Sequence, residues 1–211
     1  LASGGEMDTL YDRFPWFFYP HTYSAINHPI VAIIVAVKFE YPSAIDTLEN
    51  DIQKTILLTT SPMSKRVGVP YEINFDVEIP KNLKIINKGP DPNDFFAGEI
   101  PLAVLLEGKF TSVYTNRVKP LTLENGIENH DKGIATKMIV ISDGNVIKNQ
   151  LEGDRPLELG YDKMTQSLYG NKEFLLNAVN YLLDDSGLIN IRTKKIAVPF
   201  LDSRVAANER T

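Results

Sequence analysis

The sequence predicts an α/β fold, and three segments carry the prediction. A buried strand over residues 138–141 runs into a Ser-Asp-Gly turn at 142–144, and a capped amphipathic helix follows over 172–185. A nearly continuous apolar run over 100–108 predicts a central strand covered on both faces. Sheets of this class usually bind ligands at loops beyond the carboxyl ends of their strands, so the turn at 142–144 is the first candidate site.

Composition and charge narrow the classes of function. The chain has 211 residues, of which 43% are hydrophobic and 23% charged, as in an ordinary globular protein with a sizeable core. Its net charge of −5 and its scattered Lys and Arg residues argue against nucleic acid as a main partner, because phosphate binding needs clustered cations. Cysteine is absent, which excludes disulfides, thiol catalysis and cysteine-ligated zinc.

No apolar run of the chain approaches the ~20 residues needed to cross a bilayer; the closest, residues 29–37, stops at Lys38. The chain begins with Leu1 and shows no signal segment, which suggests a piece of a longer protein. We expect residues 1–13 to be a disordered end, residues 14–202 to form a single α/β domain, and residues 203–211 to be a flexible tail.

The first half of the chain predicts four strands before the central one. Residues 13–19 are aromatic and bounded by prolines, residues 30–41 are rich in Val and Ile, and residues 54–60 form a short apolar run. Residues 71–79 alternate between apolar and polar side chains, which predicts an amphipathic strand. Its apolar face comprises Tyr71, Ile73, Phe75, Val77 and Ile79.

The second half predicts one clear helix. Residues 110–117 form either a short helix or an extension of the central strand, and residues 121–133 are a polar excursion. In the helix over 172–185, Asn171 is a natural N-cap, Glu173 suits the positive end of the helix dipole, and Gly187 suits the stop. Two final strands are expected at 189–192 and 195–201.

The turn after the strand at 138–141 is a place where a nucleophile could sit. Ser142 or Asp143 at the strand end could serve a hydrolase or transferase, and Asn145 is a further weak candidate for ligand binding. No helix starts directly behind Ser142, and only three histidines could act as a base. The favoured interpretation is a tight turn in which the Asp143 side chain accepts hydrogen bonds from nearby amides.

Metal and cofactor motifs are absent from the sequence. The three histidines share no ligand spacing, residues 91–94 lack the glycine and distal glutamate of an EF-hand loop, and there is neither a Gly-x-Gly-x-x-Gly motif nor a P-loop. We therefore predict no cofactor, no metal and no catalytic residues.

Aromatic side chains near the start of the chain form a second candidate site. Of these, Trp16 and Tyr19 are the weak candidates for binding a glycan or a peptide, although packing in the core and at an edge is the favoured interpretation. The full set is Phe14, Trp16, Phe17, Phe18, Tyr19 and Tyr23.

Several short sequence motifs, which follow one another in the same order over most of the chain, resemble those of the gliding-motility-associated GldG family. This family is an auxiliary component of an ABC-2-type transporter in Bacteroidetes. The resemblance extends from about residue 14 to residue 202 and includes the Ile-Ser-Asp-Gly-Asn word at 141–145. It rests on residues 14–20, 27–30, 38–41, 43–48, 55–59, 101–110, 141–145 and 170–174.

This resemblance implies a fold of the flavodoxin-like or class I glutamine-amidotransferase-like type: a layered sheet with flanking helices, present whole or in part. It also implies an extracytoplasmic domain at the periplasmic face of the inner membrane, whose parent protein is anchored by membrane helices outside this chain. The amidotransferase relatives use a cysteine nucleophile, which this chain lacks, so their chemistry is not carried over.

The function implied by the resemblance is that of a non-enzymatic domain that scaffolds or gates a transporter or contacts its substrate. Its partners would be the permease and ATPase subunits of the transporter and other proteins of the gliding or secretion machinery. The loops at 61–70, 87–98, 121–133 and 143–168 would supply the contacts. The alternatives are a glycan- or peptide-binding module that uses the aromatic segment, and a hydrolase that uses Ser142 or Asp143.

Overall fold

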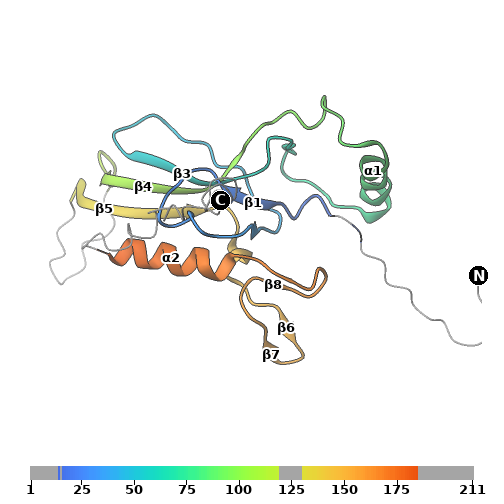
Figure 1. The fold of residues 1–211 in the computed structure, drawn as a ribbon. Helices are drawn as coiled ribbons and strands as arrows, with labels where there is room; N and C mark the ends of the chain where they lie inside the picture. Colours follow the sequence, from blue (N-terminus) through green and yellow to red (C-terminus); the bar gives the residue numbers. More distant parts are fainter. Residues whose placement is uncertain (1–13, 15, 119–129, 185–211) are drawn as a thin grey trace, which may run out of the picture.

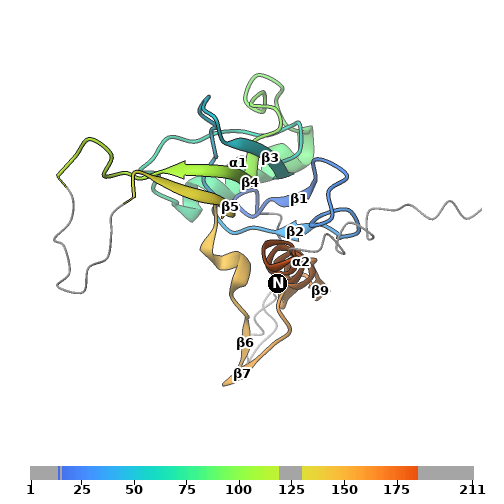
Figure 2. The same cartoon turned by 90° about the vertical axis from the view of Figure 1, so that its left-hand side faces the viewer.

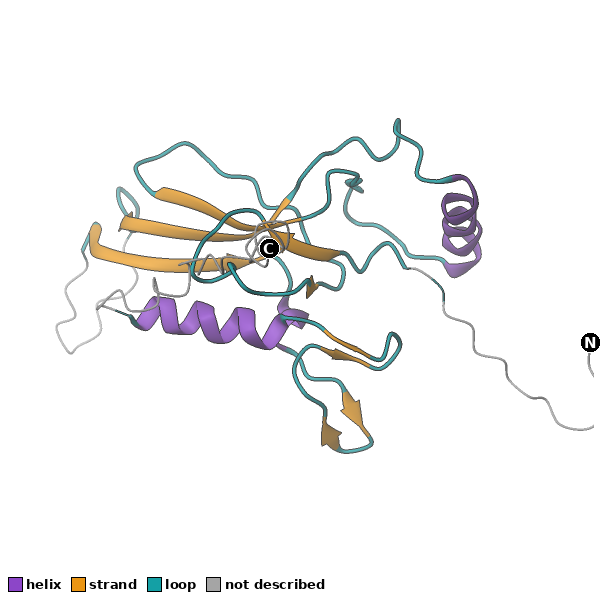
Figure 3. Ribbon diagram, viewed as in Figure 1, coloured by secondary structure: helices purple, strands orange, loops and turns teal. Residues whose placement is uncertain are grey.

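The computed structural model describes residue 14 and residues 16–118 and 130–184, which form a curled five-stranded sheet with two helices (Figures 1 and 3). The segments expected at 1–13, 189–192, 195–201 and 203–211, and most of the excursion at 121–133, lie outside the described residues. The strands are, in order across the sheet, β2 (Val37–Lys38), β1 (His21–Ser24), β3 (Gln53–Thr59), β4 (Pro101–Thr111) and β5 (Lys132–Ile141).

The predicted α/β class is confirmed, but the flavodoxin-like or amidotransferase-like sheet is not. Every pair of neighbouring strands is antiparallel, whereas those folds use parallel strands joined by helices that cross the sheet. Helix α1 (Phe75–Lys88) lies in the connection between β3 and β4, yet it extends away from the sheet (Figure 1). The chain therefore returns beside the strand it has just left, and the resulting pair is antiparallel.

The predicted central strands are confirmed. Strand β3 matches the prediction for 54–60, and β4 lies between β3 and β5 with residues 102–105 at most 2% exposed. Strand β4 continues to Thr111 and residues 113–116 form turns, so only the first two residues of the segment 110–117 extend the strand, and the short helix does not form. Strand β5 is buried on one face only, because Met138 and Val140 are 46% and 39% exposed while Ile139 and Ile141 pack against the core.

Two predicted strands near the start of the chain are largely wrong. Within 13–19, residues 17–19 form a turn in which the Tyr19 N–H donates to the Trp16 carbonyl at 3.1 Å. Within 30–41, only β2 is a strand, and the N–H groups of Val31 and Ala32 donate to the His28 carbonyl at 2.9 and 2.8 Å. Ile30, Val31 and Val37 of this run are buried, whereas Ile33 and Val35 are 78% and 66% exposed, so the apolar run forms a turn that is buried only in part.

The predicted strand at 71–79 is also wrong, because α1 begins at residue 75. The Asn74 side chain accepts from the Asp76 N–H at 2.9 Å, and its carbonyl accepts from the Val77 and Glu78 N–H groups. An Asn cap followed by acidic residues in the first turn stabilises a helix start. Capping therefore prevails over an alternation that suits a strand.

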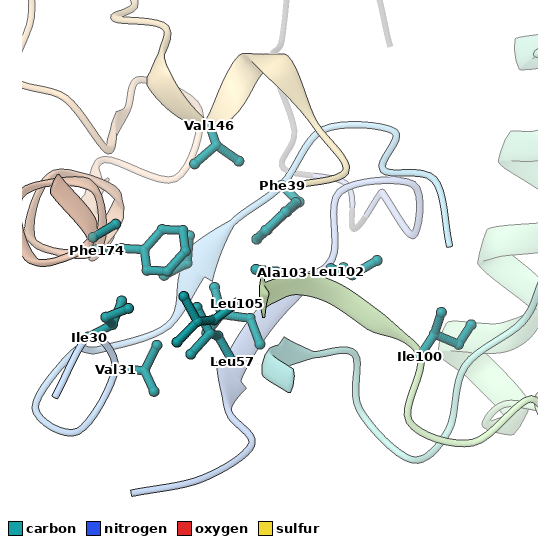
Figure 4. Packing of buried hydrophobic residues seen from close by; sticks show 13 residues of the cluster. Ile30, Val31, Phe39, Leu57, Ile100, Leu102, Ala103, Leu105, Val146 and Phe174 are labelled. Carbon is teal, nitrogen blue, oxygen red and sulfur yellow. The ribbon is translucent and has the colours of Figure 1, made fainter. Parts of the chain in front are cut away.

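Helix α2 (Asn171–Leu183) confirms the predicted helix and lies along one face of the sheet in both views (Figures 1 and 2). Phe174 points from α2 toward the β-sheet residues of the core, and Val146 enters from the short helix η1 (Gly144–Ile147) (Figure 4). Between η1 and α2, two small hairpins replace the expected loop: β6 (Leu151–Glu152) with β7 (Arg155–Pro156), and β8 (Tyr161–Asp162) with β9 (Ser167–Leu168). The core comprises Ile30, Val31, Val37, Phe39, Leu57, Leu58, Ile100, Leu102, Ala103, Leu105, Val146, Phe174 and Ala178.

Candidate functional site

Ser142 lies at the end of β5, where the sequence placed it, but its hydroxyl is not prepared for catalysis. Its backbone N–H donates to the Leu102 carbonyl at 3.0 Å, and its carbonyl accepts from the Ser43 N–H at 3.3 Å. Its Oγ is buried and has no hydrogen-bond partner among the described residues. A nucleophilic serine needs a base within hydrogen-bond reach, and the described part of the chain supplies none.

Asp143 caps a local turn, as predicted, and also fastens two distant segments together, which was not predicted. Its Oδ1 accepts from the Asn145 N–H at 2.7 Å and caps η1. Its Oδ2 accepts from the Glu40 N–H at 2.6 Å, which ties the end of β5 to the segment after β2. With both oxygens engaged by backbone amides, Asp143 has a structural role, while Asn145 is exposed beside it.

A buried ion pair lies next to this turn and was not predicted. Lys38 Nζ lies 2.7 Å from Asp162 Oδ2 and 3.2 Å from Glu40 Oε1, and the Lys38 and Asp162 side chains are 9% and 6% exposed. The same Nζ lies 5.0 Å from the centre of the Tyr19 ring, within cation–π range. Strand β2, the hairpin β8–β9 and the aromatic segment therefore meet at one amine.

The electrostatics of this centre follow from burial and pairing. Burial alone would raise the pKa of Asp162, but hydrogen bonds from Lys38 and from the Met164 N–H outweigh it and hold that pKa below its usual value. Burial opposes the charge on Lys38 too, and its two carboxylate partners nevertheless raise its pKa. Burial raises the pKa of the Tyr19 hydroxyl, and burial and the nearby Lys38 charge lower the pKa of His21. The centre therefore holds one buried ion pair beside neutral rings.

Asn171 joins α2 to the backbone of this ion-pair centre. Its Oδ1 accepts from the Lys38 N–H at 3.0 Å, and its Nδ2 donates to the carbonyls of Lys38 and Val146 at 2.9 and 3.3 Å. Gly170, not Asn171, is the N-cap, which corrects the predicted cap. A Cβ on Gly170 would lie 2.8 Å from both Ile34 Cγ2 and the Val35 carbonyl, so only glycine permits this close approach.

Trp16 and Tyr19 come together in one cluster of rings. Trp16 Nε1 donates to the Tyr41 hydroxyl at 3.2 Å, and the Trp16 ring centre lies 5.5 Å from that of Phe75 on α1. Tyr19 packs edge-on against Tyr41 at 5.0 Å. Trp16, Phe18 and Tyr19 are half-buried, while the rings around them are 38% to 61% exposed. We call this cluster the aromatic surface: Trp16, Phe17, Phe18, Tyr19, Tyr41, Tyr71 and Phe75.

The structure links the two sites that the sequence predicted separately. The Tyr41 N–H donates to the Phe18 carbonyl at 3.0 Å, and the neighbouring Glu40 N–H donates to Asp143. The sequence did not predict a place in either site for Lys38, Asp162 or Asn171. A signal existed for Lys38, which stands between Val37 and Phe39 in a run expected to form a strand, but nothing local marks Asp162.

The described part of the chain offers little else that could bind a ligand. None of its groups of His, Asp and Glu side chains converges in a way that could hold a metal ion. A shallow depression is lined by Lys65, Arg66, Asp94, Phe96 and Ala97, and Lys65 pairs there with Asp94 at 3.4 Å.

Neither of the two described helices is long and apolar enough to cross a membrane.

Comparison with known proteins supplies the family. Searches of the curated proteins and of the solved structures found no match. Residues 1–178 match the family described as an ABC-type uncharacterized transport system, whose members are auxiliary components. Because this match covers most of the 211 residues, the chain belongs to the auxiliary family of ABC-type transport systems.

Proposed function

We propose that this chain is a non-enzymatic extracytoplasmic domain of an ABC-2-type transporter auxiliary protein, placed at the periplasmic face of the inner membrane. There it would contact the permease and ATPase assembly and serve gliding motility, as the resemblance to the GldG family implies. The observation that carries the proposal is the family match over residues 1–178.

The aromatic surface is the proposed contact region. Large rings dominate the energetics of protein interfaces, especially where the backbone beneath them is held in place. Here the Phe39 N–H donates to the Pro20 carbonyl at 3.1 Å and the Tyr41 N–H to the Phe18 carbonyl at 3.0 Å, so two segments brace the rings. Tyr41 is 46% exposed and Phe17 is 44% exposed, which leaves ring area for a partner.

Affinity capture tests this function. The full-length parent protein, extracted from its own membranes in mild detergent, is expected to carry the permease and the ATPase with it. Trp16→Ala should weaken that capture, whereas Leu48→Ala, at a 78% exposed position outside the aromatic surface, should leave it unchanged. An eluate without any transporter subunit would refute the proposed function.

A glycan- or peptide-binding module is the second candidate, favoured by the same partly exposed rings. It predicts that the isolated chain binds oligosaccharides or peptides in a calorimetric screen and that Trp16→Ala removes the heat of binding. Binding of this kind without transporter capture would favour the second candidate over the first.

A further inference from the structure

The turn at residues 28–32, which we call the His28 turn, meets the second half of α2. Asn177 Nδ2 on the helix donates to the Ile30 carbonyl at 3.2 Å. The Tyr181 ring, one turn further along α2, packs edge-on against the His28 ring, with 4.9 Å between their centres. Ile30 itself is fully buried in the core (Figure 4). The His28 turn therefore holds this half of α2 against the sheet.

The two halves of α2 are anchored in different ways. The buried residues of the helix are Asn171, Phe174 and Ala178, so none of residues 179–183 is buried. The first half is secured by apolar packing and by the Asn171 hydrogen bonds, whereas the second half depends on the polar and ring contacts of the His28 turn. A segment with so few buried contacts can open locally while the rest of the fold stays intact.

One ring nitrogen of His28 organises the turn. Its Nδ1 accepts from the Ile30 N–H at 3.3 Å, and its carbonyl accepts from the N–H groups of Val31 and Ala32. A neutral imidazole has one acceptor nitrogen and one N–H group, so the proton of the neutral ring is on Nε2. A second proton has to go to Nδ1, where it would face the Ile30 N–H. Protonated His28 therefore cannot make this hydrogen bond.

We propose that the His28 turn is a pH-sensitive clasp, in which protonation of His28 at mildly acidic pH lets the second half of α2 open from the sheet. Protonation turns an acceptor into a donor, and the Ile30 N–H loses its partner. The loss loosens the backbone that presents the Ile30 carbonyl to Asn177. The first half of α2 stays in place, because neither Asn171 nor Phe174 can titrate.

Charged and titratable groups from three elements surround His28. Burial lowers the pKa of His28 below its ordinary value of 6.5, and the Glu107 carboxylate on β4 offsets this in part. The Tyr181 hydroxyl of α2 donates to Glu107 Oε1 at 3.2 Å, and burial raises its pKa, so it stays neutral. Lys137 Nζ on β5 lies 4.5 Å from the centre of the Tyr181 ring. A charged His28 would thus place a second cation beside that ring.

The direction of the pH response follows from linkage. Because the folded-state pKa of His28 lies below 6.5, the open segment takes up the proton first. The stability of the clasp is complete above pH 6.5 and is lost as the pH falls through the folded-state pKa. Between these two values, the opening equilibrium shifts by up to about tenfold for each unit of pH. Asp162 responds in another range, because its folded-state pKa lies below 3.8.

His21 is a second histidine whose pKa burial lowers, but it lies at the other end of the helix. Its ring centre is 4.6 Å from that of Tyr169, just before α2, and no described residue donates a hydrogen bond to its ring nitrogens. Protonation of His21 therefore removes no such bond. Any effect of His21 would appear in the first half of α2, so a measurement resolved by residue separates the two histidines.

Nuclear magnetic resonance on the unmodified chain tests the clasp without any substitution. At about pH 8, the ring nitrogen shifts of His28 should show the proton on Nε2, and the titration midpoint should lie below 6.5. Amide hydrogen exchange is then compared between about pH 7.5 and about pH 5, after correction for the intrinsic effect of pH. Protection of Ile30 and of residues 179–182 should fall about threefold or more, while that of residues 175–177 should not.

A matched pair of variants identifies the histidine responsible. Asn at position 28 keeps an acceptor that does not titrate, just as Asn50 Oδ1 accepts from the Ile52 N–H at 3.1 Å. His28→Asn should therefore keep α2 protected at neutral pH and abolish the loss in acid. His130→Asn, at an exposed position, should leave the loss in acid unchanged.

Four outcomes would overturn the clasp. They are a proton on Nδ1 of the neutral ring, a His28 midpoint at or above 6.5, an equal loss of protection in both halves of α2, and a loss in acid that persists in His28→Asn. The first three are read from the unmodified chain, so they stand even if the variant does not fold. Capture of transporter subunits is a separate measurement, so this proposal and the proposed function can fail independently.

Discussion

The carboxamide of Asn171 pairs with both the N–H and the carbonyl of Lys38, a residue 133 positions earlier in the chain. The Asn171 carboxamide thus makes the two hydrogen bonds that the backbone of a neighbouring strand would make to β2 at this point. It also holds the first turn of α2 against the sheet. Both residues are buried, so water cannot replace these bonds.

Asn171→Ala is expected to destabilise the fold by about 2–4 kcal/mol, because it leaves a buried N–H and a buried carbonyl of Lys38 unpaired. Urea unfolding followed by circular dichroism measures the change. Asn145→Ala is the control: that side chain is exposed, and its replacement should change the free energy of unfolding by less than about 0.5 kcal/mol. Equal effects at the two positions would contradict the role given to Asn171.

Breaking the Lys38–Asp162 pair from either side should be costly. Lys38→Met leaves the Asp162 carboxylate without its amine, and Asp162→Leu leaves the amine with only Glu40, so each is expected to lose about 3 kcal/mol of stability. The double variant should be more stable than the sum of the two losses predicts, since neither charge is then left unpaired. A double-mutant cycle by chemical unfolding measures this coupling, and simple additivity would count against a buried pair.

Acid should weaken the fold through Asp162. Its folded-state pKa lies below the ordinary value of 3.8, so the unfolded chain takes up the proton first. The stability that the carboxylate contributes is therefore present above that ordinary value and is lost as the pH falls through the lower, folded-state pKa. Unfolding measured from about pH 6 to pH 2 should show this loss, and Asp162→Asn should flatten the acid limb relative to the unmodified chain.

Ser142 and Asp143 should respond to substitution in opposite ways, although they are neighbours. Ser142→Ala removes a buried hydroxyl that has no hydrogen-bond partner in the described part of the chain, so stability should stay unchanged or rise slightly. Asp143→Ala removes the acceptor for two backbone N–H groups and should cost about 1–2 kcal/mol. Thermal unfolding of the two variants provides the comparison. A large loss of stability in Ser142→Ala would mean that its hydroxyl has a role the packing does not explain.

The local sequence predicted the secondary structure correctly where the burial of a segment followed from its own composition. The apolar run that became β4 and the stripe that became α2 were recognised because a central strand and a packed helix each show their own period. The turn at Asp143 was recognised too, since its side chain bonds within two residues. These features depend on neighbours in the chain.

The alternation of apolar and polar residues over 71–79 led to the wrong prediction of a strand. Its five apolar side chains lie on different sides of α1 and of the segment that precedes it. The Asn74 cap and the apolar spacing of Ile79, Leu83 and Ile86 were the signals that favoured a helix. Period-two patterns in short segments do not distinguish a strand from a helix start, and capping decides between them.

By itself, the sequence determined the α/β class, the central strand, the second helix and a chain without cysteine chemistry. Only the tertiary structure decided that the strands run antiparallel, that Lys38 forms an ion pair with Asp162, and that Asn171 forms hydrogen bonds with the backbone of β2. The physical reason is distance along the chain: periodicity and caps are fixed by residues within a few positions. A buried amine finds its carboxylate only after segments more than a hundred residues apart have packed together.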